Sequence, residues 1–287
     1  MPPLEPLRVR IAVIGYGRFG RVHALRARAH PAFDVQCVVD PCPVAREAAR
    51  ADGFQAEASL DDLPPDLDAA SVVTPAETHA EVAIALMRLG IDVLVEKPMA
   101  TSEAEIGTML DTAQATRCKL FTGHIERFNQ ALATAPWDKA PASIVFSRQS
   151  RLPGSSHSVV LDLMVHDLDL AAHLLHCHAP DAFRILTVQK HEAGVFAQAA
   201  MGTAVVDFHV QHGADSSSAT LSWQLAEEAA ATCQLPLSHR PGPEQPDALT
   251  RQYTAFHHVL TGQESDLASA IEGATAARRA LAIAARL

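Results

Sequence analysis

The first half of the chain alternates between short apolar runs and stretches in which apolar residues recur every three or four positions. The runs at 9–14, 33–39, 67–73, 91–95 and 119–122 predict buried strands, whereas 44–51, 80–89 and 102–115 have the spacing of amphipathic helices. A further helix is predicted after residue 17, where Val22, Leu25 and Ala29 share a face. Strands that alternate with helices of this length form right-handed βαβ units, so we expect a doubly wound parallel sheet of the α/β class.

After residue 123 the pattern changes. Apolar runs at 143–148, 183–190, 203–210 and 219–224 are connected mainly by Gly, Asp and Ser turns, which favours an open, mostly antiparallel sheet. Helices are predicted over 159–176, 249–260 and 271–287, and Pro236 to Pro246 has the composition of a linker. We therefore expect two domains, an α/β domain over 1–123 and an α+β domain over 124–287.

The first predicted strand ends on the hexapeptide Gly15-Tyr16-Gly17-Arg18-Phe19-Gly20, and a helix is predicted directly after it. A glycine-rich loop between a strand and a helix is the context in which dinucleotides bind. Gly15 allows the tight turn, Gly17 lets the backbone approach a pyrophosphate, and Gly20 lets the helix pack against the strand. We expect all six residues to contribute to cofactor binding in a Rossmann domain.

The second predicted strand ends on Asp40, twenty residues after the last glycine of this loop. A carboxylate at this place can accept hydrogen bonds from the ribose hydroxyls of NAD and repels the 2′-phosphate of NADP. The first basic residue after it is Arg46. NAD is therefore the expected cofactor, with NADP less favoured.

Two further strand ends have polar side chains. Thr74-Pro75 and His79 follow one predicted strand, and Glu96-Lys97-Pro98 follows the next. Because chemistry in such sheets gathers at the carboxyl ends of the strands, we expect Thr74, Pro75, His79, Glu96 and Lys97 to lie near the cofactor. The Lys97 ammonium could hold a substrate hydroxyl and stabilise its developing negative charge. The alternative is that the prolines only interrupt loops and that Lys97 is a surface residue.

The predicted helix over 159–176 places Asp162, His166, Asp169, His173 and His176 on one continuous face, with apolar residues on the other side. An ordinary solvated stripe is the simpler explanation. Three histidines and two acids without Lys or Arg are unusual for such a stripe, and a carboxylate one turn from an imidazole suits general acid/base chemistry. Both explanations stay open at this point: Asp162 and His166 are candidates for a catalytic pair with Asp169 as a supporting or structural acid, and the ordinary explanation applies to His173 and His176.

Composition narrows the function classes. The formal charge of −10 and the pI near 5.8 disfavour a nucleic-acid surface, which needs a basic field. The five cysteines are scattered and form no CxxC pair, the N-terminal residues lack the pattern of a signal peptide, and no apolar run is long enough to span a bilayer. These features predict a cytoplasmic protein without membrane or nucleic-acid partners.

The motifs GYGRFG, Asp40, TPAETH, EKP, GHIERFN and the helix Asp162-x3-His166-x2-Asp169 occur in one order along the chain. In this order they resemble the Gfo/Idh/MocA family of oxidoreductases, and within it the branch that contains UDP-N-acetylglucosamine 3-dehydrogenases. The resemblance implies a Rossmann domain followed by an α+β domain that often serves oligomerisation, here as a homodimer or homotetramer. Between Gln224 and Leu249 the chain is shorter than is usual for the family and is rich in Ala and Pro, where more strands would be expected.

The resemblance also implies hydride transfer between a nicotinamide and a sugar or polyol carbon. The catalytic lysine of the family corresponds to Lys97, and its acid/base pair to Asp162 and His166, so these three residues are also expected to bind substrate. A nucleotide sugar such as UDP-N-acetylglucosamine, oxidised at position 3, is the expected substrate, and a free sugar or inositol-type polyol is the alternative. Arg127, Arg148 and Arg151 are candidates for binding a diphosphate because guanidinium groups match phosphate oxygens, although all three could be ordinary surface arginines.

Two other classes of protein remain open. The short second domain is compatible with a catalytically silent NAD-binding sensor or scaffold, although such a protein would not need Lys97, Asp162 and His166 together. A metal site could be built from His166, His173, His176, Cys177 and His178, of which His173 and His176 are one turn apart. We expect no metal, because Pro180 should end the helix near His178.

Overall fold

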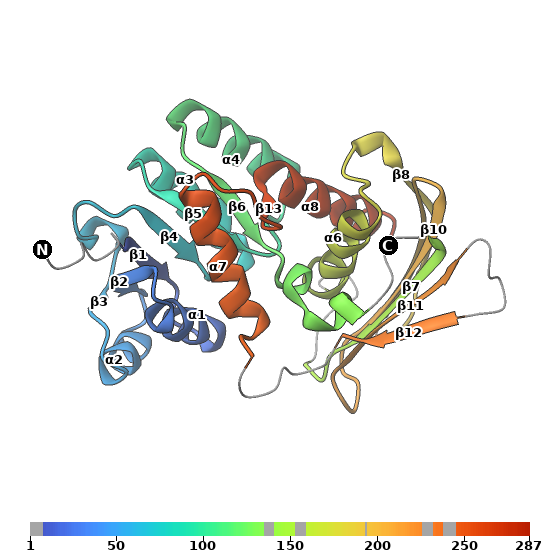
Figure 1. Cartoon of the computed structure of the whole chain (residues 1–287), viewed down its shortest axis with the longest axis horizontal. Coiled ribbons are helices and arrows are strands. Elements are labelled where there is room, and N and C mark those ends of the chain that lie inside the picture. Colours follow the sequence, from blue (N-terminus) through green and yellow to red (C-terminus); the bar gives the residue numbers. More distant parts are fainter. Residues whose placement is uncertain (1–7, 135–140, 153–158, 193, 226–231, 238–244) are drawn as a thin grey trace, which may run out of the picture. The chain divides into compact units, whose positions relative to one another are not determined.

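The computed structural model describes residues 8–134, 141–152, 159–192, 194–225, 232–237 and 245–287 (Figure 1). The chain forms two compact units. Unit 1 comprises Met1–Ala100, Ala104–Gly123 and Leu249–Ala270, and unit 2 comprises Thr101–Glu103, His124–Ala248 and Ile271–Leu287. One of the places at which the chain passes between the units is residues 123 and 124, and it returns to unit 1 at Leu249, so the predicted helix at 249–260 belongs to unit 1.

Unit 1 contains a seven-stranded sheet in the order β13-β6-β5-β4-β1-β2-β3, and all its pairs are parallel except β13 with β6. Its strands are β1 (Val9–Ile14), β2 (Phe33–Val39), β3 (Ala56–Glu57), β4 (Ala69–Val72), β5 (Asp92–Glu96), β6 (Leu120–Gly123) and β13 (Ala268–Ser269). Its helices are α1 (Arg18–Ala29), α2 (Pro43–Ala51), α3 (His79–Arg88), α4 (Glu103–Thr116, whose first residue belongs to unit 2) and α7 (Ala248–Leu260, of which Ala248 belongs to unit 2).

The sheet of unit 1 is buried because helices pack on it. Helix α1 packs on β1 and β2, and α3 packs on β4 and β5. All four residues of β4 and the last four of β5 are buried, as expected for strands of a parallel sheet. Strand β1 pairs with β2 on one side and β4 on the other, so the direction of the winding changes at its carboxyl end. Ligands bind at such a point in doubly wound sheets.

Unit 2 contains a six-stranded sheet in the order β12-β11-β7-β10-β9-β8. Its strands are β7 (Pro141–Gln149), β8 (Phe183–Lys190), β9 (Gly194–Met201), β10 (Ala204–Gln211), β11 (Ser218–Leu225) and β12 (Thr232–Pro236). Among the described strands of this sheet, only β7 and β10 form a parallel pair. Helix α6 (Val165–Leu174) and α8 (Ala270–Ala284, from Ile271 on) contribute to the core that covers one face of this sheet (Figure 1).

The predicted fold class is confirmed, a parallel α/β unit followed by a mostly antiparallel one. Four strands were not predicted: β3 and β13 are only two residues long, β9 is rich in Ala, and β12 lies where the chain was expected to lack strands. Within the predicted linker Pro236 to Pro246, residues 238–244 lie outside the described residues.

The helix predicted after residue 17 is confirmed as α1. Val22 and Ala29, two of the residues that showed its spacing, are exposed, whereas the buried residues of the helix are Gly20, His23, Ala24 and Ala27.

All five cysteines are free thiols. Over the described ranges, no helix combines the length and the hydrophobicity needed to cross a membrane.

Candidate active site

A pocket of about 750 Å³ lies in unit 1 around the carboxyl ends of β1, β2 and β4. Its size is in the range of small-molecule and cofactor sites. Of the residues predicted to bind the cofactor, eight line this pocket: Gly15, Gly17, Arg18, Phe19, Gly20, Asp40, Thr74 and Pro75. Its apolar wall was not predicted and includes Ile14, Val39, Leu60, Val73, Val82 and Ala85.

The three glycines of the loop differ in what surrounds them. Gly15 has φ +96°, and a Cβ atom there would lie 2.6 Å from the Val73 carbonyl oxygen, while a Cβ at Gly20 would overlap with the Gly15 carbonyl group. A Cβ at Gly17 would meet no protein atom within 4 Å. Gly15 and Gly20 are therefore required by the fold itself, whereas the fold does not require a glycine at position 17, and its contact with a pyrophosphate stays a prediction.

The Asp40 carboxylate is oriented by two backbone N–H groups. The N–H of Tyr16 donates to Oδ2 at 2.7 Å, and the N–H of Cys42 donates to Oδ1 at 2.8 Å. Each carboxylate oxygen retains acceptor capacity for a ribose hydroxyl. The residues therefore fit the adenosine half of NAD, and the contact of Asp40 with the ribose stays a prediction.

Tyr16 lines no part of this pocket, because its side chain is buried beneath the loop. Its hydroxyl donates to Asp52 at 2.7 Å, and burial followed by this hydrogen bond raises the pKa of Tyr16 to about 12. Tyr16 thus acts on the site through its backbone N–H.

His79 links two strand-end loops instead of facing the pocket. Its ring is 1% exposed, with Nδ1 2.8 Å from the Pro98 carbonyl oxygen and Nε2 2.9 Å from the Thr74 carbonyl oxygen. Burial lowers the pKa of His79, and the two carbonyl groups oppose this effect. The structure therefore gives His79 contacts that hold the Thr74 loop to the Pro98 loop.

Lys97 follows the last residue of β5 and precedes Pro98 through a cis peptide bond. Lys97 is half-buried, whereas Glu96 is 5% exposed and lies below the surface. Neither residue lines the pocket described above. The Lys97 backbone N–H donates to Glu96 Oε2 at 3.3 Å.

In unit 2, the helix that was predicted over 159–176 is irregular at both ends. Residues Val160–Met164 form a π-helical turn, and α6 ends at Leu174 with His176 at φ +51°. Asp162 therefore lies in a π-helical turn, a geometry that occurs frequently at functional sites. The predicted polar face is not uniformly solvated, because Asp162, His166 and His173 are partly exposed, while Asp169 is 1% exposed.

Asp169 is bound by a buried arginine. Arg127 donates to Asp169 Oδ2 through Nε at 2.8 Å and to Oδ1 through Nη2 at 2.6 Å, and both side chains are 2% exposed. Burial disfavours the charged carboxylate, but His124 and Arg127 hold the pKa of Asp169 below its usual range. Asp169 is thus a structural acid, as predicted.

Asp167 was not singled out from the sequence, yet it has a similar environment. Arg148 donates to Asp167 Oδ1 through Nη2 at 2.7 Å and to Glu126 Oε1 through Nη1 at 2.8 Å. Burial raises the pKa of Asp167 against the opposing charge of Arg148. An acid whose neighbours three and four residues away are all apolar, here Leu163, Met164, Leu170 and Ala171, is the signal for such a buried counter-charge.

The predicted diphosphate ligands Arg127 and Arg148 need correction on this geometry. Their guanidinium groups form buried ion pairs with carboxylates of the same unit, which accounts for most of their donors. Arg151 is exposed, and its backbone N–H donates to Ser217. A diphosphate role stays a prediction for Arg151.

A histidine that was not predicted lies beside Asp162. His212 follows β10 and is 5% exposed, and its Nε2 is 3.9 Å from Asp162 Oδ2. Because histidines are frequent in this sequence, no local pattern distinguished His212 from the others.

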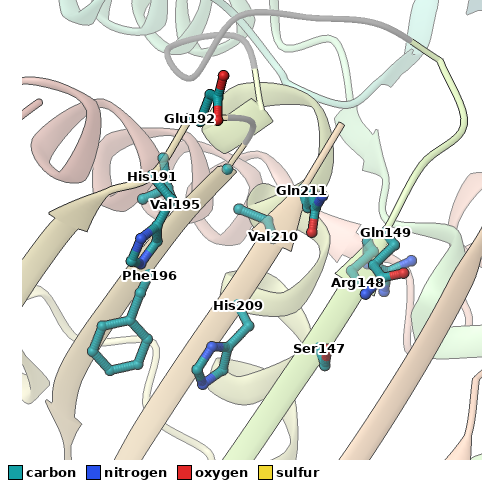
Figure 2. A pocket seen from close by; sticks show the side chains of 11 residues that line it. Ser147, Arg148, Gln149, His191, Glu192, Val195, Phe196, His209, Val210 and Gln211 are labelled. Carbon is teal, nitrogen blue, oxygen red and sulfur yellow. The ribbon is translucent and has the colours of Figure 1, made fainter. Parts of the chain in front are cut away.

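A second pocket, of about 360 Å³, lies on the sheet of unit 2. Figure 2 shows the side chains that line it along the neighbouring strands β9, β10 and β7. Phe196 and His209 form an aromatic pair there with ring centroids 4.7 Å apart. Among the described residues, no group of three or more His, Cys, Asp or Glu is arranged to hold a metal ion.

These features define unit 1 as a dinucleotide-binding Rossmann unit. Residues 9–124 match the Gfo/Idh/MocA family model, which is described as "Oxidoreductase family, NAD-binding Rossmann fold". Over this part the chain is similar to the Gfo/Idh/MocA oxidoreductases, and NAD is the cofactor of the family description.

Individual relatives agree with this assignment. A UDP-N-acetylglucosamine 3-dehydrogenase of Acidithiobacillus ferrooxidans is 33% identical over 57% of this chain and 53% of its own length. An inositol 2-dehydrogenase of Rhizobium meliloti is 28% identical over 59% of this chain and 56% of its own. The aligned part of the chain thus spans little more than half the length of these relatives. A solved structure of UDP-N-acetylglucosamine 3-dehydrogenase from Acidithiobacillus ferrooxidans has a TM-score of 0.82 at 24% identity, covering 98% of both chains, and shares the fold.

Proposed function

We propose that this protein is an NAD-dependent dehydrogenase that oxidises or reduces a secondary alcohol carbon of a sugar. The observation that supports it most strongly is the cofactor pocket, in which Gly17 leaves its backbone open and Asp40 is fixed by two N–H groups. When bound, NAD supplies the acceptor or donor of the hydride. The chain itself must then bind the alcohol, polarise its oxygen and move its proton.

We assign these tasks to three side chains. Lys97 polarises the reacting oxygen through its ammonium, which stabilises the developing negative charge. His166 accepts the hydroxyl proton in the oxidative direction, because histidine has the side chain whose ordinary pKa lies closest to neutrality. Asp162 orients the imidazole or holds a neighbouring hydroxyl of the substrate. Its carboxylate is partly exposed, which leaves it accessible to such a group.

A nucleotide sugar is the substrate class that we favour. The support is the similarity to a UDP-N-acetylglucosamine 3-dehydrogenase, at a higher identity than to an inositol 2-dehydrogenase. In this proposal the oxidised carbon is position 3 of the sugar, and Arg151 is the remaining arginine available to a diphosphate. A free sugar or an inositol-type polyol is the second candidate, supported by the inositol relative.

The test is a substrate screen with NAD, in which reduced nicotinamide is followed by its absorbance at about 340 nm. We expect reduction with UDP-N-acetylglucosamine and less with glucose, N-acetylglucosamine or myo-inositol. If NAD is reduced only with the polyol, the proposed substrate class is wrong and the proposed reaction stands. No reduction with any compound, by a protein that binds NAD, would favour a catalytically silent NAD-binding sensor.

We also propose that the chain forms a homo-oligomer through the face of the unit 2 sheet that carries Ser147, Gln149, Phe196, His209 and Gln211. These residues alternate with the buried positions of their strands, and they are half-buried or exposed. The other three members of this set are uncharged polar side chains from β10 and β7, beside the aromatic pair (Figure 2). Sedimentation of the native protein and of a Phe196→Glu variant tests it: we expect a dimer or tetramer that dissociates in the variant.

A further inference from the structure

Glu96 has a buried carboxylate directly before the proposed catalytic lysine. Its Oε1 lies 3.4 Å from His23 Nε2, and its Oε2 accepts the backbone N–H of Lys97 at 3.3 Å. A Cβ atom at position 123 would overlap with Oε1, so the glycine that ends β6 provides the space for this carboxylate. Two other segments of unit 1, α1 and the end of β6, therefore meet at Glu96.

His23 is the other half of this arrangement and is fully buried on helix α1, three residues after Gly20. Its Nδ1 lies 3.1 Å from the Tyr253 hydroxyl and 3.2 Å from the Ser71 hydroxyl. One of these hydroxyl groups can donate to Nδ1, which leaves the ring proton on Nε2, facing Glu96. The ring of His23 also packs edge-on against Phe19, at 4.7 Å between centroids, and Phe19 lines the cofactor pocket.

The charge state of Glu96 follows from these neighbours. Burial alone would disfavour the carboxylate, but the adjacent ring of His23, together with Lys97 and His79, holds the pKa of Glu96 below its usual range. An ionised carboxylate in a buried position is tolerated only when it is hydrogen-bonded and its charge is balanced. Glu96 is thus a fixed negative charge under the backbone of Lys97.

We propose that His23 and Glu96 are positioning residues for Lys97: His23 fixes the Glu96 carboxylate, and this carboxylate fixes the backbone and balances the charge of the lysine. The same histidine contacts Phe19 in the cofactor pocket, so one buried network joins the cofactor helix to the lysine. This inference rests on the proposed function only for the statement that Lys97 is catalytic.

The experiment compares Glu96→Gln and His23→Phe with the parent protein, and uses His30→Gln as the matched control. His30 lies directly after the same helix α1 and contacts α7 through Thr254 at 3.0 Å, and no contact of its ring that the structure describes involves Glu96 or Lys97. Glu96→Gln keeps the shape of the side chain and removes its charge. If His23→Phe does not fold, Glu96→Gln still decides the outcome.

The first readout needs no substrate. The chain has four lysines, so acetylation by a hydroxysuccinimide ester can be followed for each of them by peptide mass. Lys119 serves as the internal reference, because its ammonium donates to the carbonyl groups of Val259 and Leu260. We expect Lys97 to react roughly three- to tenfold faster in Glu96→Gln and His23→Phe, since a loosened backbone and a lost negative charge both favour the reactive amine. The NAD dissociation constant should stay within about threefold of the parent value.

The second readout is turnover. We expect kcat to fall by roughly ten- to a hundredfold in both variants with little change in KM, while His30→Gln keeps the parent values. Unchanged Lys97 acetylation in folded Glu96→Gln would overturn the proposal. If Lys97 is acetylated faster in the variants but the parent protein reduces no NAD with any substrate, the positioning role stands. In that case the proposed function is rejected instead.

Discussion

The two regions that carry the candidate chemistry use charge in different ways. In unit 1 the cofactor pocket is formed mainly by backbone and apolar groups, and its Asp40 is held by N–H groups with acceptor capacity left for a ligand. In unit 2 the charged groups around α6 are bound to one another, Arg127 to Asp169 and Arg148 to Asp167, all four less than a tenth exposed. The charged group of the unit 1 pocket is thus accessible to a ligand, whereas the charged groups of unit 2 pair with one another and hold α6 in place.

The buried pairs of unit 2 should respond most strongly to substitution. Arg127→Met leaves the Asp169 carboxylate buried without its main counter-charge, so we expect a loss of about 3–5 kcal/mol in the free energy of unfolding. The paired variant Arg127→Met with Asp169→Leu should recover most of this loss, because it removes both charges. Urea denaturation of the two single variants and the paired variant measures the coupling. Equal losses in the single and paired variants would show that the ion pair itself is not what stabilises α6.

A substitution in the cofactor pocket should weaken NAD binding without lowering the stability of the fold. Gly17→Ala adds a Cβ atom to a position that is open in the protein, so the melting temperature should change little while the NAD dissociation constant rises by roughly a hundredfold. Gly107→Ala, at an open position of helix α4, is the matched control and should leave NAD binding unchanged. Calorimetric titration with NAD measures both. Parental affinity in Gly17→Ala would remove the argument that a pyrophosphate lies against this backbone.

Asp40 should determine the choice between the two nicotinamide cofactors. Asp40→Ala removes the ribose acceptor and the negative charge that repels a 2′-phosphate, so NAD should bind about ten- to thirtyfold more weakly and NADP should lose less. Because Asp40 is partly exposed, the free energy of unfolding should change by less than in Arg127→Met. The measurement is a parallel titration of parent and variant with both cofactors. An unchanged ratio of the two affinities would contradict the role of Asp40.

The smallest expected effect is the pH dependence of unit 2. The pKa of Asp169 is lowered in the folded state, so its contribution to stability is present above the ordinary aspartate pKa of about 4 and is lost as the pH falls below it. Burial raises the pKa of Asp167, so that residue acts in the opposite direction. The paired Arg127→Met, Asp169→Leu variant should therefore lose less stability than the parent on acidification, by about 1 kcal/mol. Urea midpoints at neutral and acidic pH measure this difference, and parallel curves would contradict it.

The difference between the regions also explains what the sequence could predict. The cofactor loop depends on glycines at fixed spacing and on an acid after the next strand, so it can be recognised from local sequence, and β1 and β2 lie where they were predicted. The contacts of Arg127 with Asp169 and of Arg148 with Asp167 join residues 42 and 19 positions apart, and no local pattern encodes them. For the same reason no local pattern marks His23 as a buried residue, because its partners come from β4, β5 and α7.

Helix α6 shows a second limit of prediction. Regular α-helical spacing placed Asp162 and His166 one turn apart, but hydrogen bonding in Val160–Met164 is π-helical, which changes the angle between successive side chains. The residue types that suggested acid/base chemistry are all present. Their relative orientation depends on backbone geometry that the hydrophobic pattern does not reveal.

The central claim is that the chain binds NAD in unit 1 and uses Lys97 and His166 for chemistry. Its most direct test measures NAD binding and NAD reduction on the same preparations of the parent, Lys97→Ala and His166→Ala proteins with an accepted sugar substrate. We predict that all three bind NAD with similar affinity and that both variants lose at least about a hundredfold in turnover. Oxidation of the substrate at the parental rate by His166→Ala or Lys97→Ala would contradict the account.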